Sequence, residues 1–215
     1  MNKHNLKLYQ SGGSPNARRV RIYLAERGIC VNMVPVDLGA REQFSGAYAA
    51  VNPRQVVPTL VLGDGVAIGE VPAIWRYLED IYPDRSLFGD TPKERALATM
   101  WERRMEQEGF APTVEAVRNA APAFKGRAIS GPHAYVQIPE LIERSRQRVR
   151  NFHGDLEVLL EDRSFIAGER FSVADITALV AIDFAAQALR LPIAEDAVAT
   201  QRWYDAVSSR PSMSA

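Results

Sequence analysis

Residues Ser14, Pro15 and Asn16 place a hydroxyl, a proline ring and an amide at the start of the amphipathic stretch "SPNARRVRIYLAERGI". Ser-Pro is a helix-entry signal, with Ser14 as N-cap and Pro15 at the first helical position, where the missing N–H costs nothing. Such a helix start carries unpaired backbone donors and the positive end of the helix dipole, so it suits an anion. The same residues would also suit a start without a ligand, in which Ser14 only caps and Asn16 is solvated.

The elements around this helix alternate between strand and helix in the first part of the chain. Residues 6–9 are predicted as a strand, and an apolar stripe predicts the helix that ends at Gly28. Residues 31–36 are predicted as an edge strand, because Pro35 cannot donate to a ladder. "TLVL", "GDG" and "VAIG" predict a hairpin, and "VPAIWRYLEDIY" predicts a helix. The predicted order is βαβ followed by ββα.

A turn-rich linker, "PDRSLFGDTP", separates this part from a helical remainder. One long helix carries Trp101 and Met105, and apolar residues at threes and fours predict another over 138–159. Ser172 with Asp175 three residues later forms a capping-box variant before a helix that is apolar nearly all round. We therefore expect an α/β domain over residues 1–82 and an all-helical domain over residues 91–215.

Composition excludes several classes of partner. Lys plus Arg number 26 and Asp plus Glu number 26, so no basic field recruits nucleic acid. No apolar stretch approaches the about 18 residues of a membrane helix, and the first residues lack an apolar leader region. We expect a cytoplasmic protein with no nucleic-acid or membrane partner.

Cysteine and histidine usage argues against a metal site. The single cysteine, Cys30, excludes an internal disulfide framework and is expected to be buried as a small hydrophobe. The three histidines are scattered without metal-ligand spacing, so we expect no bound metal. Of the arginines in the first helix, Arg18, Arg19 and Arg21, most are expected in solvent.

Four ordered motifs carry a resemblance to a known family. "SPNARRVRIYLAERGI" resembles the start of serine-type soluble glutathione transferases, and its hydroxyl-Pro-Asn order resembles bacterial members. "NPRQVVPTL", "AIGEVPAIWRYLED" and "FIAGERFSVADI" are similar to the next three family segments. The resemblance spans about residues 4 to 210. It implies a thioredoxin-like N-terminal domain followed by an all-helical domain, a homodimer, and glutathione as co-substrate with no tightly bound cofactor.

The resemblance also implies roles for residues of the first domain. Ser14 and Asn16 would hold the glutathione sulfur as a thiolate. Val57-Pro58 would be a cis bond that turns the Val57 N–H and C=O toward the tripeptide.

Three further positions would meet the charged ends of glutathione. Glu70 would face the γ-glutamyl ammonium, and Gln43 falls where some relatives bind the glycyl carboxylate. Val71 departs from the family pattern, which has serine there. Valine keeps the backbone N–H but lacks the hydroxyl, so glutathione is expected to bind more weakly by the hydrogen bond that serine would supply.

The electrophile pocket would be lined by residues of the helical domain and nearby loops, for which the candidates are Met105, Phe110, His133 and Tyr135. Aromatic residues on helices also serve as core, so this alternative stays open. If Ser14 is not the activating group, His133 could polarise the thiol through a bound water.

These observations predict a glutathione transferase in which the thiolate attacks a small electrophile. One alternative is glutathione-dependent reduction of a disulfide or hydroperoxide, which would use the same thiolate. Another is a non-catalytic interaction protein with the same fold.

Overall fold

The computed structural model describes residues 4–215, which form two compact units. The first unit contains the chain up to Ser86, together with Ser130–His133 and Ser214–Ala215. The second contains Leu87–Ile129 and Ala134–Met213. The first unit is thus discontinuous in sequence. The expected domains, 1–82 and 91–215, do not provide for the return of Ser130–His133 and Ser214–Ala215 to the first unit.

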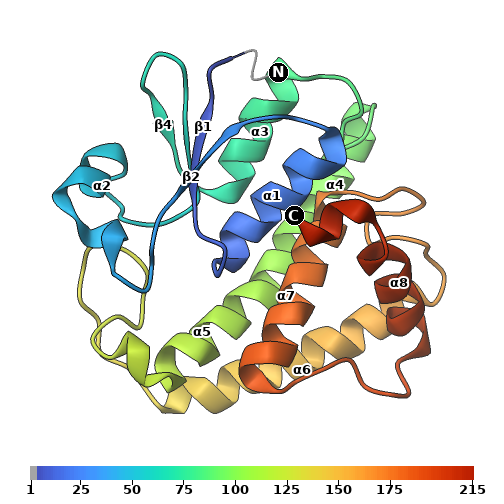
Figure 1. Cartoon of the computed structure of the whole chain (residues 1–215). Helices are drawn as coiled ribbons and strands as arrows, with labels where there is room; N and C mark the ends of the chain where they lie inside the picture. The colour runs from blue at the N-terminus through green and yellow to red at the C-terminus, as the bar shows by residue number, and fades with distance from the viewer. Residues whose placement is uncertain (1–3) are drawn as a thin grey trace. The chain divides into compact units, whose positions relative to one another are not determined.

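The first unit is built on a four-stranded sheet with the order β2-β1-β3-β4. The strands are β1 (Lys7–Gln10), β2 (Asn32–Pro35), β3 (Thr59–Val61) and β4 (Ala67–Ile68). β1 pairs with β2 in parallel and with β3 antiparallel, and β3 pairs with β4 antiparallel. β2 is an edge strand, as its proline predicts (Figure 1).

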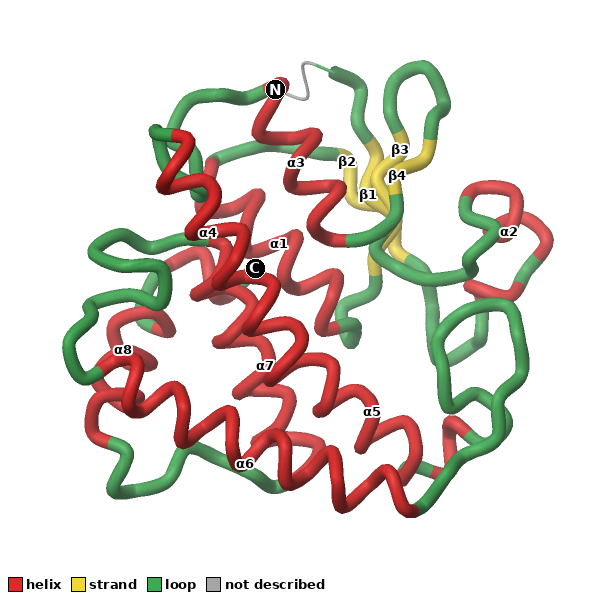
Figure 2. Tube along the Cα trace, turned by 180° about the vertical axis from the view of Figure 1, so that it is seen from behind, coloured by secondary structure: helices red, strands yellow, loops and turns green. Residues whose placement is uncertain are grey.

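Helices cover both faces of this sheet. Figure 2 shows α1 (Pro15–Arg27) and α3 (Val71–Ile81) on one side and α2 (Gly46–Val51), which follows a 3-10 turn at Glu42–Phe44, on the other. α1 and α3 pack against each other. Both helices and the sheet carry fully buried apolar side chains, among them Ala17 and Val20 of α1, Ile74 and Leu78 of α3, and Leu8 and Leu60 of the strands.

The prediction of a buried Cys30 is wrong, because this side chain is exposed. α1 ends at Gly28 in the left-handed conformation, and the chain then passes to β2, an edge strand that is mostly exposed. A cysteine between a helix end and an edge strand has no core to enter.

The second unit is all-helical. Its helices are α4 (Pro92–Arg104), α5 (Ala111–Ala120), α6 (Glu140–Leu160), α7 (Val173–Leu189) and α8 (Val198–Ser208), with a 3-10 turn at Pro122–Phe124 and a last one over Pro211–Ser214. A π-helical turn, Met105–Phe110, joins α4 to α5, so the long helix predicted there is interrupted. Pro112 follows this turn, and a proline cannot donate its share of a regular α-helical ladder.

α7 is the central helix of this unit. Most of its residues are buried, including Ile176, Leu179 and Ile182, and it packs against α4, α5 and α8. Its predicted capping box is present, with the Ser172 hydroxyl accepting from Ala174 N and the Asp175 carboxylate accepting from Ser172 N. The predicted fold class, a thioredoxin-like domain followed by an all-helical domain, is confirmed.

Candidate functional site

Three segments converge at one end of the first unit's sheet, where β1 and β4 end and β3 begins. β1 and β4 both pair with β3 in antiparallel fashion, so β1 and β4 run in the same direction. α1 follows β1 and α3 follows β4, which puts the amino ends of both helices at the same end of the sheet. Thr59, the first residue of β3, pairs with Tyr9 near the end of β1, so the loop before β3 reaches that end too. The topology therefore brings Ser14, Val57 and Glu70 together.

Ser14 caps α1 through its hydroxyl oxygen, and its hydroxyl hydrogen is left without an acceptor among the described residues. Its Oγ accepts from Ala17 N at 3.2 Å, and its own N–H donates to Ser11 O at 3.1 Å. A hydroxyl has one O–H donor besides its acceptor capacity, and no described residue accepts that proton. The two interpretations of Ser14, structural cap and anion donor, are thus compatible in a single side chain.

The Asn16 side chain is oriented by Arg19. Asn16 Oδ1 accepts from Arg19 Nη1 at 3.0 Å, and the Arg19 guanidinium lies 5.2 Å from the centre of the Trp75 ring. Arg19 is only 1% exposed, so it does not lie in solvent as most arginines of this helix are expected to. With its oxygen held by a buried cation, Asn16 has its Nδ2 donors left for another partner, because no described residue accepts from them.

Arg21 braces the loop that precedes the helix. Its Nη1 donates to Gln10 Oε1 at 2.8 Å and to Ser11 O at 3.2 Å. Burial, together with the nearby Arg18 charge, lowers the pKa of Arg21. Spacing along one helix did not reveal this role, since the acceptors are loop carbonyls and a strand-end glutamine.

The Val57-Pro58 bond is cis, as the family resemblance implies. Val57 itself is buried, and no described residue pairs with its backbone N–H or C=O. A peptide segment lying alongside could pair with both groups in the manner of an added strand.

A polar cluster that sequence reasoning missed holds this loop. Tyr48 Oη donates to Val56 O at 2.7 Å, Asn52 Nδ2 donates to the same carbonyl at 3.1 Å, and the Thr59 hydroxyl also donates to it. Burial raises the pKa of Tyr48, which keeps its hydroxyl protonated. The asparagine of "NPRQVVPTL" was the available signal, because a buried side-chain amide needs partners.

Glu70 and Val71 open α3. Glu70 has φ 64° and ψ 124°, a conformation that non-glycine residues adopt at a cost in free energy. Its side chain is exposed and makes no cap bond. Val71 is buried, so its side chain belongs to the core while its N–H belongs to the helix start.

Gln43 lies in the 3-10 turn Glu42–Phe44. Its Oε1 is buried, and no residue within 4–215 donates to it. The side chain therefore has unused hydrogen-bonding capacity, as a ligand-binding amide would.

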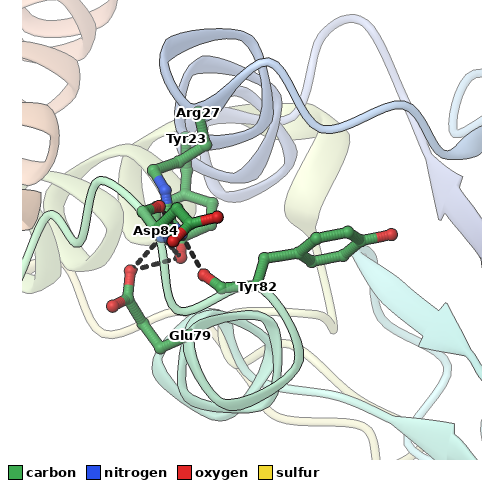
Figure 3. Close-up of polar contacts among 5 residues, drawn as sticks. All are labelled: Tyr23, Arg27, Glu79, Tyr82 and Asp84. Carbon is green, nitrogen blue, oxygen red and sulfur yellow. Dashed lines mark hydrogen bonds and ion pairs between the residues drawn. The ribbon is translucent and has the colours of Figure 1, made fainter. Parts of the chain in front are cut away.

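A buried network ties the far ends of α1 and α3 together (Figure 3). Arg27 donates to the Tyr23 hydroxyl, to the Glu79 carboxylate and to the carbonyls of Tyr82 and Asp84, the last at 2.7 Å. Tyr23 Oη donates to Glu79 Oε1 at 2.6 Å, and burial together with that bond raises the pKa of Tyr23. Because α1 and α3 run in the same direction, fastening their ends also holds their amino ends, with Ser14 and Glu70, in register.

The candidates for the electrophile pocket fall in different places. Met105 and Phe110 are 2% and 5% exposed inside the helical unit, where Phe110 packs near Phe184. Tyr135 is 44% exposed on a loop of the same unit. His133 is exposed and belongs, with Ser130, to the first unit.

Within residues 4–215, no group of three or more His, Cys, Asp or Glu side chains is arranged to hold a metal ion. None of the helices described is long and apolar enough to cross a bilayer.

Comparisons with known proteins agree with this geometry. Residues 8–86 match the family model described as "Glutathione S-transferase, N-terminal domain", and residues 139–206 match "Glutathione S-transferase, C-terminal domain". The chain is 32% identical to "Glutathione S-transferase 2" of Saccharomyces cerevisiae over 98% of its own length and 89% of that relative.

Solved structures show the same likeness. The crystal structure of Gtt2 from Saccharomyces cerevisiae superposes with a TM-score of 0.87 at 30% identity, covering 97% of this chain and 98% of that one. A glutathione S-transferase domain-containing protein from Marinobacter aquaeolei VT8 superposes with a TM-score of 0.85 at 34% identity, covering 96% and 99%. With both halves matched and a relative similar over almost its full length, the chain belongs to the glutathione S-transferase family.

Proposed function

We propose that this protein binds glutathione and stabilises its thiol as a thiolate, which attacks a small, hydrophobic electrophile. The observation that carries the proposal is the pair of unused donors at the start of α1, the Ser14 hydroxyl proton and the Asn16 amide. Both groups sit at the positive end of a helix dipole.

Hydrogen bonds from these donors are strong enough to lower the pKa of the glutathione thiol by about two units. Lowering a thiol pKa from about 8.5 by about two units requires roughly 2.7 kcal/mol. One hydrogen bond to the charged sulfur contributes about 1.5–3 kcal/mol, and the helix terminus adds about 0.3–1 kcal/mol. No general base is needed.

The rest of the tripeptide would be held by the converging segments. The unpaired Val57 N–H and C=O would bind the cysteinyl backbone, and the Glu70 carboxylate would bind the γ-glutamyl ammonium. The Val71 N–H and the Gln43 amide would meet the two carboxylates. Without a hydroxyl at position 71, binding is expected to be weaker by about 1.5–3 kcal/mol than with serine, unless another group serves that carboxylate.

Of the four candidates for the electrophile pocket, His133 and Tyr135 are exposed, whereas Met105 and Phe110 are buried in the helical unit. We expect the protein to act as a cytoplasmic homodimer. This part rests on the family resemblance. A thiolate so formed would also serve reduction of a disulfide or hydroperoxide, which activity assays with each substrate class would separate from conjugation.

A second route to the thiolate uses His133. Its support is that Ser130–His133 belongs to the same compact unit as Ser14 and that His133 is exposed. A neutral imidazole acting through water could take the thiol proton.

The experiment is a pH titration of thiolate ultraviolet absorbance with glutathione bound. Ser14→Ala should raise the bound thiol pKa by about one to two units, because it removes a charge-assisted hydrogen bond. Asn16→Ala should raise it less, and His133→Ala should leave it unchanged. If only His133→Ala moves the titration, the activating role passes to His133.

Calorimetry with glutathione tests the non-catalytic alternative. Heat of binding that is weakened in Ser14→Ala supports the proposal. Absence of any heat at millimolar glutathione would favour an interaction protein.

A further inference from the structure

The polar cluster of Tyr48, Asn52 and Thr59 holds a single backbone carbonyl, that of Val56. Tyr48 Oη donates to this oxygen at 2.7 Å, Asn52 Nδ2 at 3.1 Å and Thr59 Oγ1 at 3.2 Å. A carbonyl oxygen has two lone pairs, so these donors fill its accepting capacity. The direction of the Val56 C=O bond is therefore set by side chains and not by a helix or strand ladder.

The three side chains of this cluster also satisfy one another. Asn52 Nδ2 donates to Thr59 Oγ1 at 2.8 Å, and the Tyr48 and Thr59 hydroxyl oxygens lie 3.0 Å apart. The amide supplies two hydrogens and each hydroxyl supplies one, which matches the acceptors that Val56 O and the two hydroxyl oxygens offer. All three side chains are buried, so water does not compete for these bonds.

Tyr48 and Asn52 are themselves held in place. Ser45 Oγ accepts from Tyr48 N at 3.1 Å at the start of α2, and Asn52 Oδ1 accepts from Arg54 N at 2.9 Å. The Tyr48 ring belongs to one hydrophobic cluster with the Val57 side chain. The same tyrosine thus contacts Val56 through its hydroxyl and Val57 through its ring.

Fixing the Val56 carbonyl also fixes the Val57 N–H, because both bonds belong to one planar peptide group. The bond between Val56 and Val57 is trans, unlike the one that follows it. In a trans peptide group the C=O and N–H bonds point in opposite directions. Since the carbonyl is turned into the buried cluster, the N–H is turned away from it, and no described residue accepts from this N–H.

We propose that Tyr48 is a positioning residue for glutathione. With Asn52 and Thr59 it holds the Val56 carbonyl, so that the Val57 N–H is aimed at the cysteinyl carbonyl before the ligand arrives. A donor that is fixed in advance loses less conformational entropy on binding than one in a mobile loop. This inference rests on the proposed binding of glutathione at Val57, and it adds residues that act through the Val56–Val57 peptide group.

The test is calorimetry of the full-length protein with glutathione. Tyr48→Phe keeps the ring and removes the shortest bond to Val56 O. It should raise the Kd about three- to tenfold, the effect of one neutral hydrogen bond. The pKa of the bound thiol should stay at the parent value, because the donors of Ser14 and Asn16 are unchanged.

Tyr204→Phe is the matched control. It removes a hydroxyl that donates to Asp183 at 2.6 Å in the helical unit, so it imposes a comparable loss without touching the loop before β3. The Kd for glutathione should change less than about twofold. Urea denaturation shows that both variants are folded.

The Val57 amide proton separates positioning from mere stability. In the ¹⁵N-labelled parent, saturating glutathione should move this proton downfield, as expected for a proton that enters a hydrogen bond. In Tyr48→Phe the shift should be smaller, because the peptide plane is free to rotate. In Tyr204→Phe it should equal that of the parent.

Thr59 provides a second pair of variants that decides the matter if Tyr48→Phe does not fold. Thr59→Val is close in shape but lacks the hydroxyl, and it should weaken glutathione binding. Thr59→Ser keeps the hydroxyl and should restore most of the affinity.

Three results would each overturn the positioning role and leave the proposed function in place. They are a Kd of Tyr48→Phe equal to that of the parent, a raised Kd with an unchanged Val57 shift, and binding by Thr59→Ser that is no tighter than by Thr59→Val. Absence of glutathione binding by the parent would overturn the proposed function, and this inference with it.

Discussion

Three of the described helices, α1, α2 and α7, begin with a capping serine, and the caps of α1 and α7 differ in what they leave unpaired. At α7, Ser172 donates from both its N–H and its hydroxyl to Asp175, whose carboxylate also accepts from Ile166 N and Trp203 Nε1 at 2.8–3.0 Å. At α1, the Ser14 hydroxyl accepts from Ala17 N and keeps its proton unused. The first cap is closed, and the second is open.

The third helical residue makes the difference. α7 has Asp175 there, which completes the capping box, whereas α1 has Ala17, which is buried and leaves no room for an acid. At α1 and α7, the residue three positions after the serine therefore decides whether the cap is open or closed. The motif that starts a helix is the same in both places, and the neighbouring packing decides its use.

Removing the acid of the closed cap should have the largest effect. Asp175→Ala leaves four buried donors without their acceptor, and Asp175 is 0% exposed, so the free energy of unfolding should fall by about 3–4 kcal/mol. Urea denaturation measures this. The exposed acid Asp162 is the matched control, with Asp162→Ala within about 0.5 kcal/mol of the parent. Equal losses in the two variants would contradict the closed-cap interpretation.

The open cap of α1 can be altered through Arg19, which orients the Asn16 side chain. Arg19→Met removes the cation that holds Asn16 Oδ1 and frees the amide to rotate. We expect the pKa of bound glutathione thiol to rise by up to about one unit, equivalent to about 1.4 kcal/mol. The thiolate titration measures it, and Arg18→Met on the same helix is the control. An unchanged thiol pKa would mean that Asn16 does not depend on Arg19.

Exchanging each serine for alanine should separate the two caps directly. Ser172→Ala should cost about 1 kcal/mol of unfolding free energy and leave the bound thiol pKa unchanged. Ser14→Ala should cost a similar amount of stability and also move the thiol pKa. Should Ser172→Ala shift the thiol titration as well, the distinction between open and closed caps would fail.

The smallest effect concerns α8, which is capped by Glu157 from α6. Burial alone would raise the pKa of Glu157, but bonds from Ala199 and Thr200 outweigh this and hold it below its usual value. A carboxylate with a lowered pKa in the folded state stabilises above about pH 4.5 and loses that contribution as pH falls through the folded value.

The stability difference between parent and Glu157→Gln should therefore be greatest at neutral pH and shrink toward acid. It should amount to no more than about 1 kcal/mol, because the group is accessible to solvent. Urea titrations at several pH values measure it, with Glu161→Gln at the exposed end of α6 as control. A difference that grows on acidification would contradict the sign.

Periodicity and turn chemistry predicted most of the fold. The βαβ and ββα order, the edge position of β2, the Ser14 cap and the Asp175 capping box all follow from local patterns and are confirmed. These features depend on residues within one turn or one strand of each other, which is the range that a sequence pattern can report. The cis bond before Pro58 came from the family resemblance, since most prolines are trans.

The polar groups of the core could not be predicted in the same way. Arg19, Arg27 and Tyr48 are buried because partners brought near by the tertiary fold satisfy them: Asn16 with Trp75, Glu79 with two carbonyls, and Val56 O. A helical pattern assigns an arginine to solvent by default. The site roles of Gln43, Val57, Glu70 and Val71 remain predictions, because they concern a ligand.

The return of Ser130–His133 to the first unit bears on how this protein can be divided. Gly131 has φ 124°, and a Cβ at this position would lie 3.7 Å from Arg54 O. A fragment cut at Ser86 would thus lack a piece of its own fold. Chimaeras that exchange the amino-terminal half with a relative should carry this tetrapeptide along, and a library that recombines halves at the linker alone would separate residues that belong together.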